Sequence, residues 1–297
     1  MDNNELLDKL SISMINNGYA ITTRESYIRH VMNFIKLHVN IKDTSNDDLK
    51  IYIDKVADSG VSSSNLNQIK NALAYLMVKV LGKDCTLDKM RFKKDKVVRS
   101  YLNDDDIANL FSNLKGRNLI LSKFIYGTGM HLMEVLRLRV CDIHFLSMEI
   151  MVRRLDGTIE RVVPLPGFIV HDLIVLKEGV KDTLRENSVP LSHIGDQYIF
   201  GSKKITSNPV QLDQPPVSTI QKALYLAKRR SGIKGKVGCT VLRYSFGLSC
   251  AKNHVPLSIL HQIMGHGSIS DTQVYYDEVN RSFDFQSPLD RMRSPAS

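Results

Sequence analysis

The chain has 297 residues, 43% of them hydrophobic, so it is long enough to bury the cores of two domains. Lysine and arginine number 40 against 31 aspartates and glutamates, which gives a formal net charge of +9 and favours a polyanionic partner. The four cysteines have no paired spacing and the nine histidines have no metal-ligand spacing, which argues against a disulfide framework and a metal site.

The chain shows no apolar run long enough to span a membrane and no signal peptide. Its short Gly127-Thr128-Gly129 motif is too small to be a nucleotide-binding loop. We therefore expect a cytoplasmic, nucleoid-associated protein that uses no cofactor and no metal and does not contact a membrane.

Apolar residues recur at helical spacing in the first part of the chain, residues 1–90. The predicted helices cover residues 5–15, 22–38, 47–56 and 66–81. Thr22, Asn46 and Ser63 are residue types that often cap helix amino-termini, and we predict that they do so here. The first domain is therefore expected to be an all-helical bundle.

A basic segment, residues 91–101, follows this bundle and is the predicted linker. Between residues 91 and 100 a single acid, Asp95, stands against Arg91, Lys93, Lys94, Lys96 and Arg99. Such a run is usually a solvated linker, but five positive charges in ten residues also suit a polyanionic phosphate backbone, and we predict that contact. A second basic cluster ends a later predicted helix and comprises Lys222, Lys228, Arg229, Arg230, Lys234 and Lys236.

The second domain, residues 102–280, is predicted to be mainly helical with a small antiparallel sheet. Asn103, followed by three aspartates, has the pattern of a helix start. Segments 148–153 and 160–165 alternate like strands around Asp156-Gly157 and predict a β-hairpin. Further helices are predicted at residues 170–177, 218–231, 242–253 and 257–264, and prolines 209, 215 and 216 mark a loop before the second of these.

Several motifs of this domain occur in a fixed order: 127–138 (GTGMHLMEVLRL), 160–165 (ERVVPL), 241–246 (VLRYSF), 263–266 (IMGH) and 271–275 (DTQVY). They resemble the boxes of the tyrosine recombinase family of Xer, phage and integron integrases, over residues 22–280. The last pair is the most specific, because the family places its nucleophile nine residues after this histidine.

The resemblance implies a core-binding, SAM-like helical domain and a catalytic-type domain that clamp DNA between them, with the tail 281–297 docking on a neighbouring protomer. Dimerisation on DNA is therefore expected. The DNA contacts that we predict, from the resemblance and from the charge pattern, are Arg24, Arg29, Asn65, Asn67, Lys70, Lys93, Lys94, Lys96, Arg99, Arg153, Arg154, Arg161, Lys228, Arg229 and Arg230.

In the family a tyrosine attacks a DNA phosphodiester while two arginines clamp the non-bridging oxygens and a hairpin lysine protonates the leaving oxygen. Two histidine-type positions assist. By position, Arg243 matches the second arginine, His266 the third-box histidine and Tyr275 the nucleophile. Tyr276 adds an ambiguity of register.

The other family positions are substituted. The first arginine is replaced by His131, which cannot form a bidentate fork onto two phosphate oxygens. The lysine is replaced by Asp156, whose carboxylate would repel the anion that catalysis stabilises, and the second-box histidine by Thr240. Arg153, Arg154 and Arg161 hold their protons too tightly to act as general acids. We therefore interpret Tyr275 as a remnant or a structural residue, and Arg243 and His266 as phosphate-binding residues.

The degenerate pattern resembles the TnsF-type target selectors of Tn7-like transposons. The first hypothesis is a non-cleaving DNA-site reader that recruits a transposition ATPase and transposase to an attC-like or dif-like site. The first box favours integron integrases, whereas the short segment 178–197 favours Xer proteins, so both sites stay open. A second hypothesis is an active recombinase that cuts through Tyr275, and a third is an accessory subunit or a decaying gene product.

Overall fold

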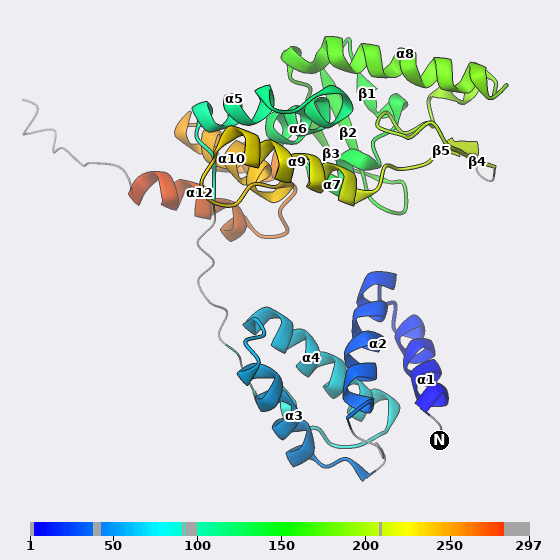
Figure 1. Ribbon diagram of the computed structural model, residues 1–297, viewed down its shortest axis with the longest axis vertical. Coiled ribbons are helices and arrows are strands. Elements are labelled where there is room, and N and C mark those ends of the chain that lie inside the picture. Colours follow the sequence, from blue (N-terminus) through cyan, green and yellow to red (C-terminus); the bar gives the residue numbers. More distant parts are fainter. Residues whose placement is uncertain (1–2, 38–42, 91, 93–99, 208–209, 282–297) are drawn as a thin grey trace, which may run out of the picture. The chain divides into compact units, whose positions relative to one another are not determined.

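The computed structural model describes residues 3–37, 43–90, 92, 100–207 and 210–281 (Figure 1). The chain separates into two compact units, Met1–Val98 and Arg99–Ser297. The predicted linker residues Arg91, Lys93, Lys94, Lys96 and Arg99 and the tail from residue 282 onward lie outside the described residues. Among the residues described, no helix has the length and apolar character that a membrane span requires.

The first unit is all-helical, as predicted. Its α-helices are α1 (Asn3–Asn16), α2 (Ile21–Ile35), α3 (Asn46–Asp58) and α4 (Ser63–Tyr75), followed by the π-helical turn η2 (Leu76–Val80) and the 3-10 turn η3 (Leu87–Lys89). Their apolar faces form one core around the fully buried Leu10, Phe34, Leu49, Leu73 and Met77. Burial of these side chains is the main stabilising contribution in this unit.

In the first unit, each predicted helix cap is either displaced by one residue or wrong. Ser45 rather than Asn46 caps α3, and it forms a capping box in which the Asp48 carboxylate accepts a hydrogen bond from the Ser45 backbone N–H at 2.9 Å. Ser62, one residue before Ser63, caps α4. The prediction for Thr22 is wrong, because α2 begins after Ala20 without a side-chain cap.

The second unit is mainly helical with a small antiparallel sheet, which confirms the predicted fold class. Its helices are α5 (Asp104–Ser112), α6 (Gly116–Thr128), α7 (Leu132–Leu136), α8 (Val170–Glu186), α9 (Val217–Ser231), α10 (Cys239–Lys252), α11 (Leu257–Met264) and α12 (Ile269–Arg281). The short 3-10 turns are η4 (Val140–Asp142), η5 (Gly167–Ile169) and η6 (Leu191–Ile194). Asn103 caps α5 as predicted, since its side chain accepts from the backbone N–H of Asp106 at 2.7 Å.

The predicted hairpin is present and belongs to a three-stranded sheet in the order β1-β2-β3. Its strands are β1 (Ile143–His144), β2 (Glu149–Arg153) and β3 (Ile159–Pro164). Val152 pairs with Arg161, and the register shifts between Val152 and Arg153. A second, unpredicted hairpin is formed by β4 (Ile205–Ser207) and β5 (Val210–Leu212). The loop predicted around residues 208–209 lies outside the described residues.

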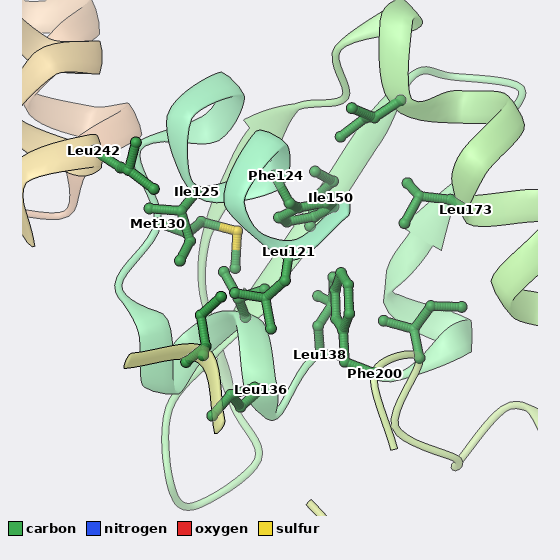
Figure 2. Packing of buried hydrophobic residues seen from close by; sticks show 14 of the residues in the cluster. Leu121, Phe124, Ile125, Met130, Leu136, Leu138, Ile150, Leu173, Phe200 and Leu242 are labelled. Atoms are coloured by element: carbon green, nitrogen blue, oxygen red, sulfur yellow. The ribbon is translucent and has the colours of Figure 1, made fainter. Parts of the chain in front are cut away.

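One hydrophobic core joins the sheet to the helices (Figure 2). Phe124 of α6 meets Phe200 edge to face at 5.7 Å between ring centroids, and Ile150 and Leu173 extend the core from β2 to α8. A separate small core links α10, α11 and α12 through Tyr244, Leu248, Leu260, Met264 and Tyr275. This second core holds together the three elements that carry the retained motif residues.

Candidate nucleic-acid interface

Arg243 is the residue at which the motif segments meet. Only 6% of it is exposed, and its guanidinium donates to the carbonyls of Gly129, at the end of α6, and of Met264, at the end of α11, the latter at 2.7 Å. Gly129 has a φ of +65°, and a Cβ there would lie 2.4 Å from the ring of Phe246. The Gly-Thr-Gly turn therefore needs glycine to approach α10 this closely.

His131 stands just after that turn, immediately before α7. Its backbone N–H donates to the Glu134 carboxylate at 2.8 Å, which holds the start of the short helix. Partial burial lowers the pKa of His131, and the positive charge of Arg243 lowers it further. The imidazole is therefore neutral at neutral pH and offers one N–H donor where the family has a charged fork.

Arg161 forms a bidentate ion pair with Glu134, with Nη1 and Nη2 donating to the two carboxylate oxygens at 2.9 and 2.8 Å. The side chains are only 8% and 13% exposed. Arg161 Nε also donates to the carbonyl of Ile263 at 2.9 Å, and a Cβ at Gly265 would lie 2.6 Å from the same guanidinium. Arg161, predicted to contact DNA, thus connects β3 to α7 and to the end of α11.

Tyr275 is buried, with 3% of it exposed, and its ring packs against Gly247, where a Cβ would lie 2.7 Å away. The ring of His266 stacks over it, with 6.0 Å between centroids and 14° between planes. Tyr276 lies in a different environment, because its hydroxyl donates to the carbonyl of Val255. Of the two tyrosines, Tyr275 is therefore the one whose ring lies beside His266.

His266 is neutral at neutral pH. Burial lowers the pKa of His266 from its ordinary value of 6.5 to about 4, and Arg243 acts in the same direction. It can donate a hydrogen bond through one ring nitrogen but carries no charge of its own at neutral pH. Arg243 is therefore the charged member of the set formed by His131, Arg243 and His266.

The lowered pKa of His266 predicts a loss of stability in mild acid. Because the unfolded chain takes up the proton first, the stabilisation is fully present above about pH 6.5 and is lost as the pH falls toward about 4. Thermal unfolding between these pH values should show a falling Tm in the wild type. His266→Gln should show a shallower fall, and an equal slope in both proteins would contradict the shift.

Asp156 and Thr240, the remaining substituted positions, are both exposed. The Asp156 carboxylate accepts from the backbone N–H of Thr158 at 2.9 Å and from its hydroxyl at 2.6 Å, and these bonds hold the hairpin turn. The hydroxyl bond is the largest cause of the lowered pKa of Asp156. At neutral pH this side chain is an ionised acceptor and has no proton to give. Thr240 lies in the first turn of α10.

The arginines of the hairpin have intramolecular partners. Arg153 Nε donates to the nearly buried Asp142 carboxylate at 2.6 Å, and Arg154 lies 3.8 Å from Glu160. At the end of α9, Arg229 is exposed and lies over the ring of Tyr225 at 6.0 Å from the centroid, beside exposed Arg230 and half-buried Lys228. These last residues form a basic surface patch at the helix terminus.

In the first unit, Asn67 and Lys70 hold the chain that leaves α4. Asn67 donates to the carbonyl of Phe92 at 3.2 Å, and Lys70 donates to that of Met90 at 3.2 Å. Arg29 is exposed and Asn65 is half-buried. Arg24 has a buried Nε with no hydrogen-bond partner. Of the predicted contacts in this unit, Arg29 is therefore the most open to a ligand.

Comparison with known proteins identifies the family to which this chain is similar. Residues 100–281 match the phage integrase family, and residues 6–87 match its N-terminal SAM-like domain. The chain belongs to the phage integrase family. The tyrosine recombinase XerA of Pyrococcus horikoshii is 25% identical over 281 residues, which covers 92% of this chain and 89% of that one. An integrase/recombinase of Escherichia coli is 24% identical over 298 residues, covering 91% and 88%.

Solved structures of recombinases have the same fold as this integrase-family chain. A lambda integrase dimer bound to a COC' core site has a TM-score of 0.71 at 15% identity, covering 97% of this chain and 100% of that one. XerH recombinase bound to its difH substrate has a TM-score of 0.63 at 17% identity, covering 87% and 79%. The described residues contain no metal-ligating cluster of three or more acidic, histidine or cysteine side chains.

Sequence reasoning missed three residues that surround this site: Glu134, His261 and Thr272. Glu134 lies within the quoted Leu-Met-Glu run, and the position three residues after His131 is where a capping acid is expected. His261 and Thr272 carry no comparable local signal. Their role depends on contacts between α11 and α12.

Proposed function

We propose that this member of the integrase family binds DNA at a recombination site without cutting it. The observation that carries the proposal is the asymmetry of the site. Arg243, His266 and Tyr275 are kept and folded together, while His131, Asp156 and Thr240 replace charged or proton-transferring groups. What remains can hold a phosphate through Arg243 and neutral donors.

The expected losses in rate and in affinity favour DNA binding over DNA cleavage. Loss of one preorganised donor to a developing anion costs about a hundred- to a thousandfold in rate. Asp156 should lower the cleavage rate more than simple loss of the lysine would, because its ionised carboxylate stands where the family has a proton donor. Binding suffers less, since much of the affinity for DNA comes from phosphate contacts spread over the interface.

The DNA that we propose is an attC-like or dif-like site, read by the chain as a dimer or higher oligomer. In the cell this binding would select the site as the target of a Tn7-like transposon, with a transposition ATPase and transposase as partners. The support is the degenerate motif pattern on an otherwise intact fold. Exposed basic residues at the end of α9, Arg229 and Arg230, supply phosphate contacts.

An active recombinase is the second candidate. The retained Arg243, His266 and Tyr275 favour it, as does similarity over most of the chain to proteins named recombinases. In that mechanism His131 and Arg153 or Arg154 would act in altered roles. Tyr275 would then have to leave its buried packing against Gly247 to reach a phosphate.

The experiment that separates the two candidates uses Tyr275→Phe. The wild type and the variant should shift attC-like or dif-like DNA equally on a native gel, because the ring and its packing are retained. Neither should give a covalent band with a nicked suicide substrate on a denaturing gel. A covalent band in the wild type that disappears in Tyr275→Phe would establish the recombinase instead. Absence of any shift with both DNAs would refute the site-reader proposal.

A further inference from the structure

The hydroxyl of Thr272 lies between two histidines. Thr272 is fully buried in α12, and its Oγ1 is 2.8 Å from Nδ1 of His266 and 3.2 Å from Nδ1 of His261. His261 belongs to α11 and His266 follows the end of that helix, so one side chain of α12 contacts both. The proposed function gives Thr272 and His261 no role.

The number of available hydrogens restricts which nitrogen of each histidine ring can be protonated. A hydroxyl has one hydrogen to donate, and a neutral imidazole has one N–H and one acceptor nitrogen. Both Nδ1 atoms contact the same oxygen, so Thr272 can donate to only one of them. At least one of the two histidines must therefore carry its hydrogen on Nδ1 and donate it to Oγ1.

The two distances indicate the direction of each bond. Hydroxyl donors form shorter hydrogen bonds on average than N–H donors do. The 2.8 Å contact fits Thr272 donating to His266, and the 3.2 Å contact fits His261 donating to Thr272. His266 then has its hydrogen on Nε2.

We propose that Thr272 and His261 are positioning residues that hold His266 in the Nε2–H form. The hydrogen bond at one ring nitrogen decides which nitrogen carries the proton, so Thr272 leaves Nε2 as the donor to a ligand. The consequence for DNA rests on the proposed function: beside Arg243, an N–H donor attracts a phosphate oxygen, whereas a bare ring nitrogen would repel it. A neutral His266 thus contributes a donor without a charge.

The test is a tautomer measurement on the full chain without DNA. With nitrogen-15 histidine labelling at neutral pH, long-range proton–nitrogen correlations show which ring nitrogen carries hydrogen, and His261→Gln and His266→Gln assign the two signals. We expect hydrogen on Nε2 of His266 and on Nδ1 of His261. Hydrogen on Nδ1 of His266, or an even mixture, would overturn the proposal.

A matched pair of variants tests Thr272 itself. Thr272→Ser keeps the hydroxyl and should keep the tautomer of His266, whereas Thr272→Val fills similar space without it and should give a mixture. In gel shifts Thr272→Val should weaken DNA binding about two- to tenfold, the size of one neutral hydrogen bond, and Thr272→Ser should not. A pure Nε2–H form in folded Thr272→Val would refute the role of Thr272.

These readouts separate the two proposals. If Thr272→Val does not fold, the wild-type and Thr272→Ser spectra still decide the tautomer. The expected tautomers in a protein that binds neither DNA would support the positioning role and overturn only the proposed function. DNA binding by a protein whose His266 carries hydrogen on Nδ1 would support the proposed function and overturn only the positioning role.

Discussion

Replacing Arg161 with methionine is expected to lower the free energy of unfolding of the second unit by about 3–5 kcal/mol, since breaking a buried ion pair leaves an uncompensated charge. The charge left behind is that of Glu134, whose side chain is 13% exposed. Burial alone would raise the pKa of Glu134, but the hydrogen bonds and charge of Arg161 outweigh it and hold that pKa below its ordinary value. Urea unfolding measures the difference.

Two control variants test whether loss of the buried ion pair causes this destabilisation. Arg185→Met removes an arginine from the exposed pair with Asp182, whose side chains are 57% and 62% exposed, and should change stability by less than about 0.5 kcal/mol. The double variant Arg161→Met with Glu134→Gln should recover part of the loss, because no buried charge remains. Equal losses in Arg161→Met and Arg185→Met would show that the Arg161 pair contributes little.

The retained motif residues and most helices of the structure could be predicted from the sequence, because both depend on the local spacing of residues. The hairpin around Asp156 follows from strand alternation, and the start of α5 from Asn103 and its aspartates. Helices α6 and α12 were missed. The first is apolar on several sides, so it lacks the one-sided stripe that marks a surface helix, and the second is largely polar.

The unpredicted part of the site depends on contacts between distant segments. Arg161 and Glu134 are 27 residues apart, on a strand and a helix, so no local pattern in the sequence pairs them. α8 continues through Gly179 to Glu186, although its prediction ended at Lys177, because Val180 and Leu184 pack into the core. Tertiary packing here outweighs the low helix propensity of glycine.

Restoring the three substituted positions together is expected to give the largest change. The triple variant His131→Arg, Asp156→Lys and Thr240→His should form a covalent complex with a nicked suicide substrate, where the wild type forms none. One recovered donor is worth about a hundred- to a thousandfold in rate, and such groups act as a unit, so single restorations should fall well short. Denaturing gels over a time course measure the yield.

The structure indicates that the scaffold tolerates these changes. All three side chains are exposed, and the bond that holds the start of α7 comes from the backbone N–H of residue 131, which arginine keeps. Lysine at position 156 does lose the bonds to Thr158, so the hairpin turn should loosen. Adding Tyr275→Phe to the triple variant must abolish the band if Tyr275 is the nucleophile. A triple variant that folds and binds DNA yet gives no band would mean that the burial of Tyr275 against Gly247, rather than the missing charges, prevents cleavage.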